Sequence, residues 1–255
     1  MTMTFQDGVS PGASYAGTTD LILASDANGN ANLGGYETLE TFYDTSEVRR
    51  TLLRWDLTNI PDGSVIEGAT VELYRHDGYT ENDMEIALYR VTRGWTEGTG
   101  DDLWPGGGYV PDGATWDTYD GSGAWSSQGG DYDATTDYGD GPNGIVDRVT
   151  LPDGTGNGWV SLDATGAMRD WVEDGVSNQG LLLRPLSGEY TYHYFRSRNY
   201  GTAAQRPRLV VTYTDDGGLP ARINFQPSSS EQPVGYRRDD GGDYAVHGSY
   251  SYGWR

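Results

Sequence analysis

Most of this chain consists of short segments in which apolar and polar residues alternate, separated by turns rich in Gly and Asp. In residues 50–56, for example, Leu53 and Trp55 fall on one side of an extended chain and Arg54 falls on the other. A period of two residues is the pattern of a β-strand with one buried face. The chain is therefore expected to build its core from strands.

Segments of this kind recur along the first 213 residues, with turn residues between them. They are residues 20–25, 49–56, 70–76, 84–90, 148–151, 158–162, 180–184, 190–197 and 208–213. Many short strands at such spacing are typical of a sandwich or barrel. We predict an all-β fold, a jelly-roll β-sandwich with one short helix and long loops.

The one helix is expected in residues 163–175. Asp163 can cap the first turn, and Ala167, Met168 and Trp171 recur at helical spacing. Gly175 is expected to end the helix. A single helix in a β chain is expected to close one end of the sandwich.

Residues 97–157 form a long insertion without clear periodicity. Loops longer than about 15 residues tend to be functional or disordered. Trp104, Trp116 and Trp125 are spread through this one, which favours an ordered loop that faces a ligand.

The composition changes after residue 213. Residues 215–221 begin with two Asp and two Gly and predict a linker. The first domain is expected to span residues 5–214, and residues 222–255 to form the truncated start of a second β module. Because so short a segment cannot bury a core of its own, the sequence is interpreted as part of a longer parent chain with further domains.

The chain has 38 acidic and 17 basic residues and a formal net charge of −21. All 17 basic residues are Arg, and the acids are 27 Asp and 11 Glu. Such a surface repels phosphate backbones and anionic lipids, which argues against nucleic-acid and membrane partners. An excess of Asp without Lys is expected of a halophilic protein, because at high salt the Debye length falls to about 3 Å. An acidic extracellular module that needs calcium is the alternative.

The chain contains no Cys, which excludes disulfide frameworks, thiol catalysis and zinc–thiolate sites. No stretch approaches the roughly 18 apolar residues of a membrane span, so no membrane insertion is expected. Residues 1–7 lack the features of a signal peptide. A fragment of a secreted parent would lack one too, and the expected location is extracellular or at the cell surface.

Several segments together resemble the DNRLRE-type module, also called the disaggregatase-related domain. They include Arg-Thr-Leu-Leu-Arg-Trp-Asp at 50–56 and Gln-Gly-Leu-Leu-Leu-Arg at 179–184, and their order and spacing match over about residues 5–214. The resemblance implies a β-sandwich accessory domain of large secreted proteins, some of which bind acidic polysaccharides such as alginate. It carries over no catalytic residues. Residues 222–255 resemble the opening of a galactose-binding-like module, with Asn-Phe-Gln-Pro at 224–227 and Tyr-Gly-Trp at 252–254.

Binding of a polysaccharide needs flat rings that stack on sugar C–H faces and polar groups that bind hydroxyls or carboxylates. Arg suits carboxylates because its guanidinium donates two parallel hydrogen bonds. Tyr192, Tyr194 and Arg196 fall on one side of a predicted strand, and Arg50 and Arg54 on one side of another. If these strands are neighbours, the five residues form a carbohydrate-binding platform. The alternative is that the Tyr pack in the core and the Arg pair with Asp.

Calcium needs several oxygen ligands at short spacing in a Gly-rich loop. Asp26, Asn28 and Asn30 supply oxygens at alternate positions, as at the start of an EF-hand, but the Gly of an EF-hand turn is absent. Asp131 and Asp133 form a second candidate metal site. The alternative is that these are ordinary Asx turns, which are common without metal.

Motifs of nucleophilic, zinc or phosphate chemistry do not occur in the sequence. We therefore predict a non-catalytic, extracellular carbohydrate-binding module for an acidic polysaccharide, with structural calcium. A structural spacer of a cell-surface or fibre protein is the alternative, favoured if the Arg face is fully paired to Asp. A polysaccharide lyase is the third possibility and requires His193, a Tyr and an Arg in one groove.

Overall fold

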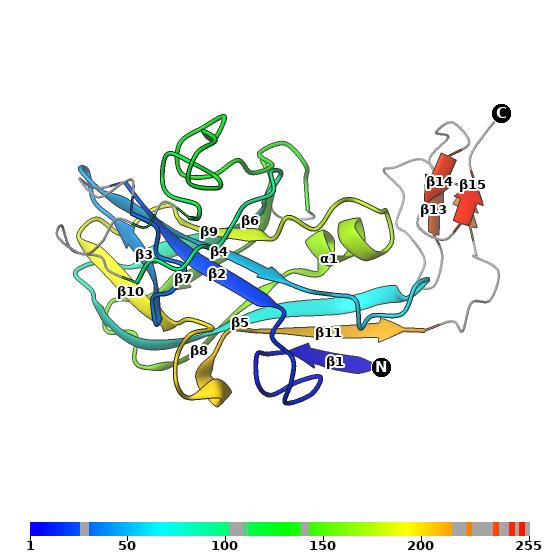
Figure 1. Cartoon of the computed structure of the whole chain (residues 1–255), viewed down its shortest axis with the longest axis horizontal. Helices are drawn as coiled ribbons and strands as arrows, with labels where there is room; N and C mark the ends of the chain where they lie inside the picture. The colour runs from blue at the N-terminus through cyan, green and yellow to red at the C-terminus, as the bar shows by residue number, and fades with distance from the viewer. Residues whose placement is uncertain are drawn as a thin grey trace.

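The fold is all-β with one short helix, as the alternation predicted (Figure 1). The computed structural model describes residues 1–25, 31–101, 110, 112–138 and 143–215, and the backbone of four short strands between residues 223 and 252. The elements up to residue 215 are β1 Thr2–Phe5, β2 Thr18–Ala24, β3 Thr38–Tyr43, β4 Val48–Trp55, β5 Val65–Tyr79, β6 Met84–Arg90, β7 Ile145–Leu151, β8 Gly158–Asp163, α1 Thr165–Val172, β9 Leu181–Pro185, β10 Thr191–Arg196, the 3-10 turn η1 Ala203–Gln205, and β11 Arg208–Thr214.

These strands form two antiparallel layers of a jelly-roll-like sandwich. One layer has the order β1-β11-β5-β10-β3, and β8 also pairs with β5; the other contains β2, β4, β9, β6 and β7. The layers are continuous at the β3–β4 hairpin, where Phe42 pairs with Arg49 and Tyr43 with Val48. Within the described residues, no helix has the length and apolar character needed to cross a membrane.

The main core lies between the two layers. It includes Ile22, Leu53, Leu73 and Phe195, which have no exposed surface. α1 packs against this core at one end of the sandwich (Figure 1) and buries Ala167, Met168 and Trp171 there. The N-cap residue is Ala164, without a side-chain cap, so Asp163 does not cap the helix as expected. Asp163 lies one residue earlier, and its carboxylate accepts a 2.7 Å hydrogen bond from the backbone N–H of Thr165.

A second core lies on the outer face of β2, β4, β9 and β6. Leu21, Leu52 and Leu182 face this side and meet Trp95 and Trp125 of the insertion between β6 and β7. The insertion therefore covers one layer of the sandwich. Trp125 is 5 % exposed and donates from Nε1 to the carbonyl of Thr115, so it is a core residue rather than the ligand-facing one expected. Trp104 lies outside the described residues.

All nine predicted strand segments are present, and two of the strands described up to residue 215 had not been predicted. β1 pairs with β11 from Thr2 to Phe5, so the sandwich begins before the expected boundary at residue 5. β3 has Glu40 in its centre and one aliphatic residue, Leu39, which weakens its alternating pattern.

Beyond residue 215 the structure describes two short pairings. β12 (Ile223–Phe225) pairs in parallel with β13 (Arg237–Asp239), and β14 (Ala245–His247) pairs antiparallel with β15 (Tyr250–Tyr252). The expected division into a linker and a second module remains a hypothesis.

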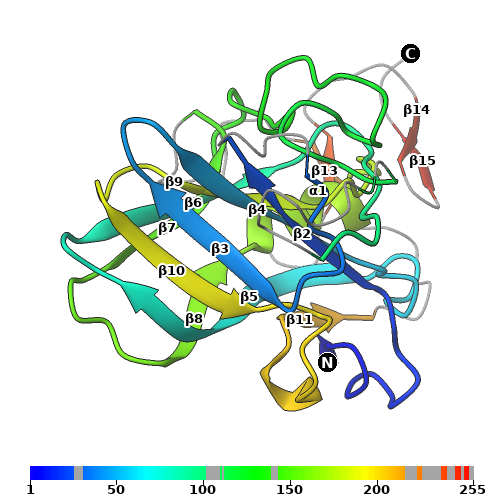
Figure 2. The ribbon, with the colours of Figure 1, turned by 60° about the vertical axis from the view of Figure 1, so that its left-hand side comes forward.

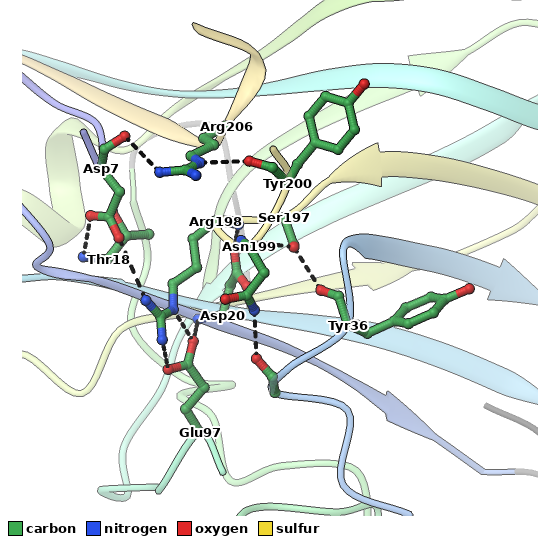
Figure 3. A network of polar contacts seen from close by, with 11 residues as sticks. Asp7, Thr18, Asp20, Tyr36, Glu97, Ser197, Arg198, Asn199, Tyr200 and Arg206 are labelled. Atoms are coloured by element: carbon green, nitrogen blue, oxygen red, sulfur yellow. Dashed lines mark hydrogen bonds and ion pairs between the residues drawn. The ribbon is translucent and has the colours of Figure 1, made fainter. Parts of the chain in front are cut away.

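A buried charge network centred on Arg198 joins four distant segments (Figure 3). The guanidinium donates to both carboxylate oxygens of Glu97, at 2.5 and 2.6 Å, and lies 3.7 Å from Asp7. The backbone N–H of Arg198 donates to Asp20 at 2.7 Å, and that of Asp20 donates to Glu97 at 2.8 Å. Burial raises the pKa of Asp20 well above its usual range. Arg198 thus holds three carboxylates together, from the N-terminal loop, β2 and the start of the insertion.

Replacing Arg198 should destabilise the fold, because it leaves buried carboxylates without their cation. We expect Arg198→Gln to lower the free energy of unfolding by about 2–3 kcal/mol at pH 7. This is less than the cost of breaking a fully buried ion pair, because solvent partly screens the guanidinium. The loss should shrink at pH 4, where the carboxylates can take up protons. Urea unfolding at both pH values measures it.

Arg148→Gln is the matched control for the change in charge. Arg148 is 52 % exposed and lies 3.4 Å from Glu85, so its removal should cost less than about 1 kcal/mol. Equal losses for the two variants, or a loss at Arg198 that does not depend on pH, would contradict the assigned role.

Candidate functional site

Three of the predicted binding residues share the outer face of the first layer. Tyr192, Tyr194 and Arg196 alternate on β10 with fully buried Thr191, His193 and Phe195, and they remain partly exposed. β10 pairs with β3 on one side and β5 on the other. Figure 2 shows β3, β10, β5 and β8 side by side, with no other strand or helix in front of them.

Aromatic rings from four strands gather on this face. Tyr192 lies 4.9 Å from Tyr194, 6.0 Å from Tyr79 and 6.3 Å from Phe42, between ring centroids. Tyr194 stacks on His76 at 6.1 Å with an angle of 17° between the rings. These contacts make one continuous row of rings across β3, β10 and β5.

The surface continues onto β8. Trp159 pairs with Tyr74 in the β5–β8 register, and their rings lie 5.4 Å apart, edge to face. The guanidinium of Arg208 lies 4.0 Å from the centre of the Trp159 ring. We call this surface the aromatic face; its residues are Phe42, Tyr74, His76, Tyr79, Trp159, Tyr192 and Tyr194.

The charged groups around the aromatic face are mostly paired. Arg49 contacts Glu40 at 2.5 Å, and Arg208 contacts Glu72 at 2.6 Å. Arg196 differs: its guanidinium lies 3.8 Å from the centre of the Tyr200 ring, and it has no hydrogen bond or ion pair within the described residues. Its buried Nε is unpartnered. Arg196 therefore retains free donors beside the rings.

The rings themselves are uncharged near neutral pH. Burial and the nearby charge of Arg196 lower the pKa of His76. Burial and the charge of Glu40 raise the pKa of Tyr194. The face therefore offers neutral ring surface next to one unpaired guanidinium.

Arg50 and Arg54 do not lie on this face. They project from the outer side of the second layer, beneath the insertion, because β3 separates β10 from β4. Arg50 donates to the carbonyl of Gly129 at 2.7 Å and lies 4.7 Å from the centre of the Trp116 ring. Burial lowers its pKa to about 10. The expected five-residue platform is therefore divided between two layers.

The structure describes only one of the two candidate metal sites. Asp26, Asn28 and Asn30 lie outside the described residues. Asp131 accepts from Arg93 at 2.6 Å and Asp133 from Arg90 at 2.7 Å, so both carboxylates already have cationic partners and do not fit a calcium site. Across the described ranges, no group of three or more acidic or His side chains is arranged to hold a metal ion.

His193 is a core residue. It has no exposed surface, and its Nδ1 accepts a 2.8 Å hydrogen bond from Nε of Arg75. Burial, together with the charge of Arg75, lowers its pKa to about 4. A group sealed inside the sandwich cannot meet a polymer, so the lyase alternative gains no support from its placement.

Sequence reasoning missed most of the aromatic face. The omitted residues are Phe42, Tyr74, His76, Tyr79 and Trp159. Tyr74 and His76 do alternate with buried Leu73 and Arg75, and this pattern could have indicated an outward aromatic side of β5. Joining them to Tyr194 and Trp159 requires the strand order, which the pattern does not contain.

Comparison with known proteins identified no match: no family model matches this chain, and no curated protein does. The resemblance to the DNRLRE-type module therefore remains a hypothesis based on the quoted motifs.

The depressed pKa of His193 predicts a loss of stability in acid. The unfolded imidazole binds a proton below about pH 6.5 and the folded one only near pH 4, so stability falls as the pH drops through this window. The full contribution is about 3 kcal/mol, from 1.36 kcal/mol per pKa unit. His193→Gln should lack this part of the loss. The difference in unfolding free energy between the two proteins, measured from pH 7 to 4, tests it; a constant difference would contradict a buried, neutral His193.

Proposed function

We propose that this protein is a non-catalytic binding module for an extracellular polysaccharide, and that the aromatic face binds the chain. The observation that carries the proposal is a continuous, partly exposed row of uncharged rings on a sheet. Exposed apolar surface of this kind commonly marks an interaction site. Rings held by strand pairing need little ordering on binding, because their positions are already fixed.

A carbohydrate fits this surface better than the other polymers that stack on aromatic rings. Single-stranded nucleic acid also stacks on rings, but its binding relies on a positively charged groove. A chain with a net charge of −21 opposes that partner. Sugars present C–H faces to the rings, and the Tyr hydroxyls can exchange hydrogen bonds with sugar hydroxyls.

The proposed ligand is acidic because of Arg196. Stacking on Tyr200 orients its guanidinium, and no carboxylate of the described chain neutralises it. An oriented guanidinium can bind a sugar carboxylate with two parallel hydrogen bonds. The unpaired Arg196 also favours binding over the spacer alternative, which would have every Arg of the face paired.

We further propose that the module works outside the cell or at its surface, as part of a longer parent protein and at high salt. An extracellular polysaccharide ligand supports the location, and the resemblance to the DNRLRE-type module supports the accessory role. The acidic, Lys-free composition supports the halophilic setting.

Truncating the aromatic face should weaken polysaccharide binding. We expect Tyr192→Ala to lower affinity for alginate or polygalacturonate at least tenfold, because Tyr192 contacts three other rings of the face. Tyr192→Phe keeps the ring and should retain most of the affinity. Arg196→Gln should weaken acidic chains more than a neutral glucan. Affinity electrophoresis in gels cast with each polymer measures these effects.

Tyr119→Ala is the control for loss of one Tyr ring, because Tyr119 packs in the second core against Trp125. It should leave retardation unchanged while the protein stays folded. Absence of retardation by every polymer, for the unmodified protein, would favour the spacer.

Structural calcium remains part of the proposal only through residues 26–30. If these bind calcium, a chelator should lower the melting temperature, and Asp26→Asn should remove that sensitivity. Asp131→Asn should keep the sensitivity, because Asp131 is engaged by Arg93. A melting temperature unaffected by chelator would remove calcium from the proposal.

A further inference from the structure

A cleft lies where the end of β4, the start of β2 and the end of α1 meet. Its volume is about 730 Å³, within the ~300–1,000 Å³ typical of small-ligand sites. Its walls include Thr19, Arg54, Trp55, Asp62 and Trp171. No residue of the aromatic face lines it, so the two surfaces are separate.

Arg54 provides the cationic group of this cleft. Its guanidinium makes no hydrogen bond and no ion pair in the part of the chain that the structure describes. Its guanidinium carbon lies 5.0 Å from the centre of the Trp95 ring, and stacking of this kind leaves the N–H edges available. Burial lowers the pKa of Arg54, and the charge of Glu97 offsets only part of this effect, so the half-buried cation is incompletely compensated. A bound carboxylate would offset that cost.

The other lining residues add carboxylate acceptors and three polar groups that are buried in the walls of the cleft. The indole N–H groups of Trp55 and Trp171 and the hydroxyl of Thr19 are buried without a hydrogen-bond partner. Asp56 and Asp62 are the carboxylates of the lining, and Asp56 already accepts from the backbone N–H of Thr58 at 2.9 Å. Carboxylates accept hydrogen bonds only, so next to a bound anion they require a ligand that also carries hydroxyls.

We propose that this cleft binds one hexuronate unit, with its carboxylate on Arg54 and its hydroxyls toward Asp56 and Asp62. A carboxylate alone would face two like charges, and a neutral sugar would leave Arg54 unpaired. A sugar acid satisfies both kinds of group. The same chemistry is offered by a free sugar acid and by the end of an acidic polysaccharide. The site is argued from its own residues and does not rest on the aromatic face.

The test is a titration of the full chain with glucuronate and with glucose, followed by calorimetry and by the indole N–H resonances. Glucuronate should shift the signals of Trp55 and Trp171, while glucose at the same concentration should not. Arg54→Gln should weaken glucuronate binding at least tenfold. Arg148→Gln removes an equal charge from β7 and should bind as the unmodified protein does.

Equal binding of glucose and glucuronate would overturn the proposal, as would glucuronate binding that Arg54→Gln leaves intact. If Arg54→Gln fails to fold, the resonances of the unmodified protein decide: no shift at either indole overturns the site. A uronate oligomer that binds more tightly than the monomer would identify a chain end as the ligand, and equal binding would identify the free sugar acid.

Failure here and failure of the proposed function are distinguishable. Tyr192→Ala should lose polysaccharide retardation but keep glucuronate binding in the cleft, and Arg54→Gln should show the reverse for the monomer. The two variants therefore separate the two surfaces.

Discussion

One guanidinium, that of Arg198, compensates a buried group of three carboxylates, and the arrangement of four segments depends on it. Asp7 comes from the N-terminal loop, Asp20 from β2 and Glu97 from the start of the insertion. Partners so distant in the chain can meet only when both layers and the insertion are in place. Trp95 lies two residues before Glu97, so the same contact positions the ring on which Arg54 stacks. The network therefore lies two residues from a ring that contacts Arg54, a residue of the cleft.

Two sets of arginines in this protein differ in whether a carboxylate partners the guanidinium. Arg49, Arg90, Arg93 and Arg208 pair with carboxylates. All but Arg90 also place the guanidinium over an aromatic ring, and Arg90 donates to the hydroxyl of Tyr138 instead. Arg54 and Arg196 stack on rings but have no hydrogen bond or ion pair among the described residues. Carboxylates exceed basic groups by 38 to 17, so the absence of a partner at these two positions does not reflect a shortage of acids. The lack of a partner for these two guanidinium groups supports the proposal that they bind an anionic ligand. Lysine could not replace them, because its ammonium has no planar face to stack.

The strands could be predicted because a two-residue period follows directly from burial of one face. The two-residue period fails at Leu52. It breaks the alternation of β4 because the insertion covers the outer side and buries that side as well. The same unrecognised layer explains why Arg50 and Arg54 were expected on an open platform. Alternation tells which residues share a side of one strand, but not what covers that side or which strand lies next to it. For that reason Tyr192, Tyr194 and Arg196 were identified, whereas Trp159 and His76, which join them only through strand order, were not.

The proposed binding of an acidic ligand by a chain with a net charge of −21 requires that attraction at the contact outweigh repulsion from the rest of the chain. At an ionic strength near 1 M the Debye length is about 3 Å, so repulsion from distant carboxylates is largely screened. A hydrogen-bonded guanidinium–carboxylate pair spans no more than that length and is partly protected from solvent, so it is weakened much less. Both Arg54 and Arg196 meet this condition, since each is half-buried and held against a ring. High salt would therefore remove more of the long-range repulsion than of the contact attraction, so the acidic composition is compatible with the proposed binding of an anion.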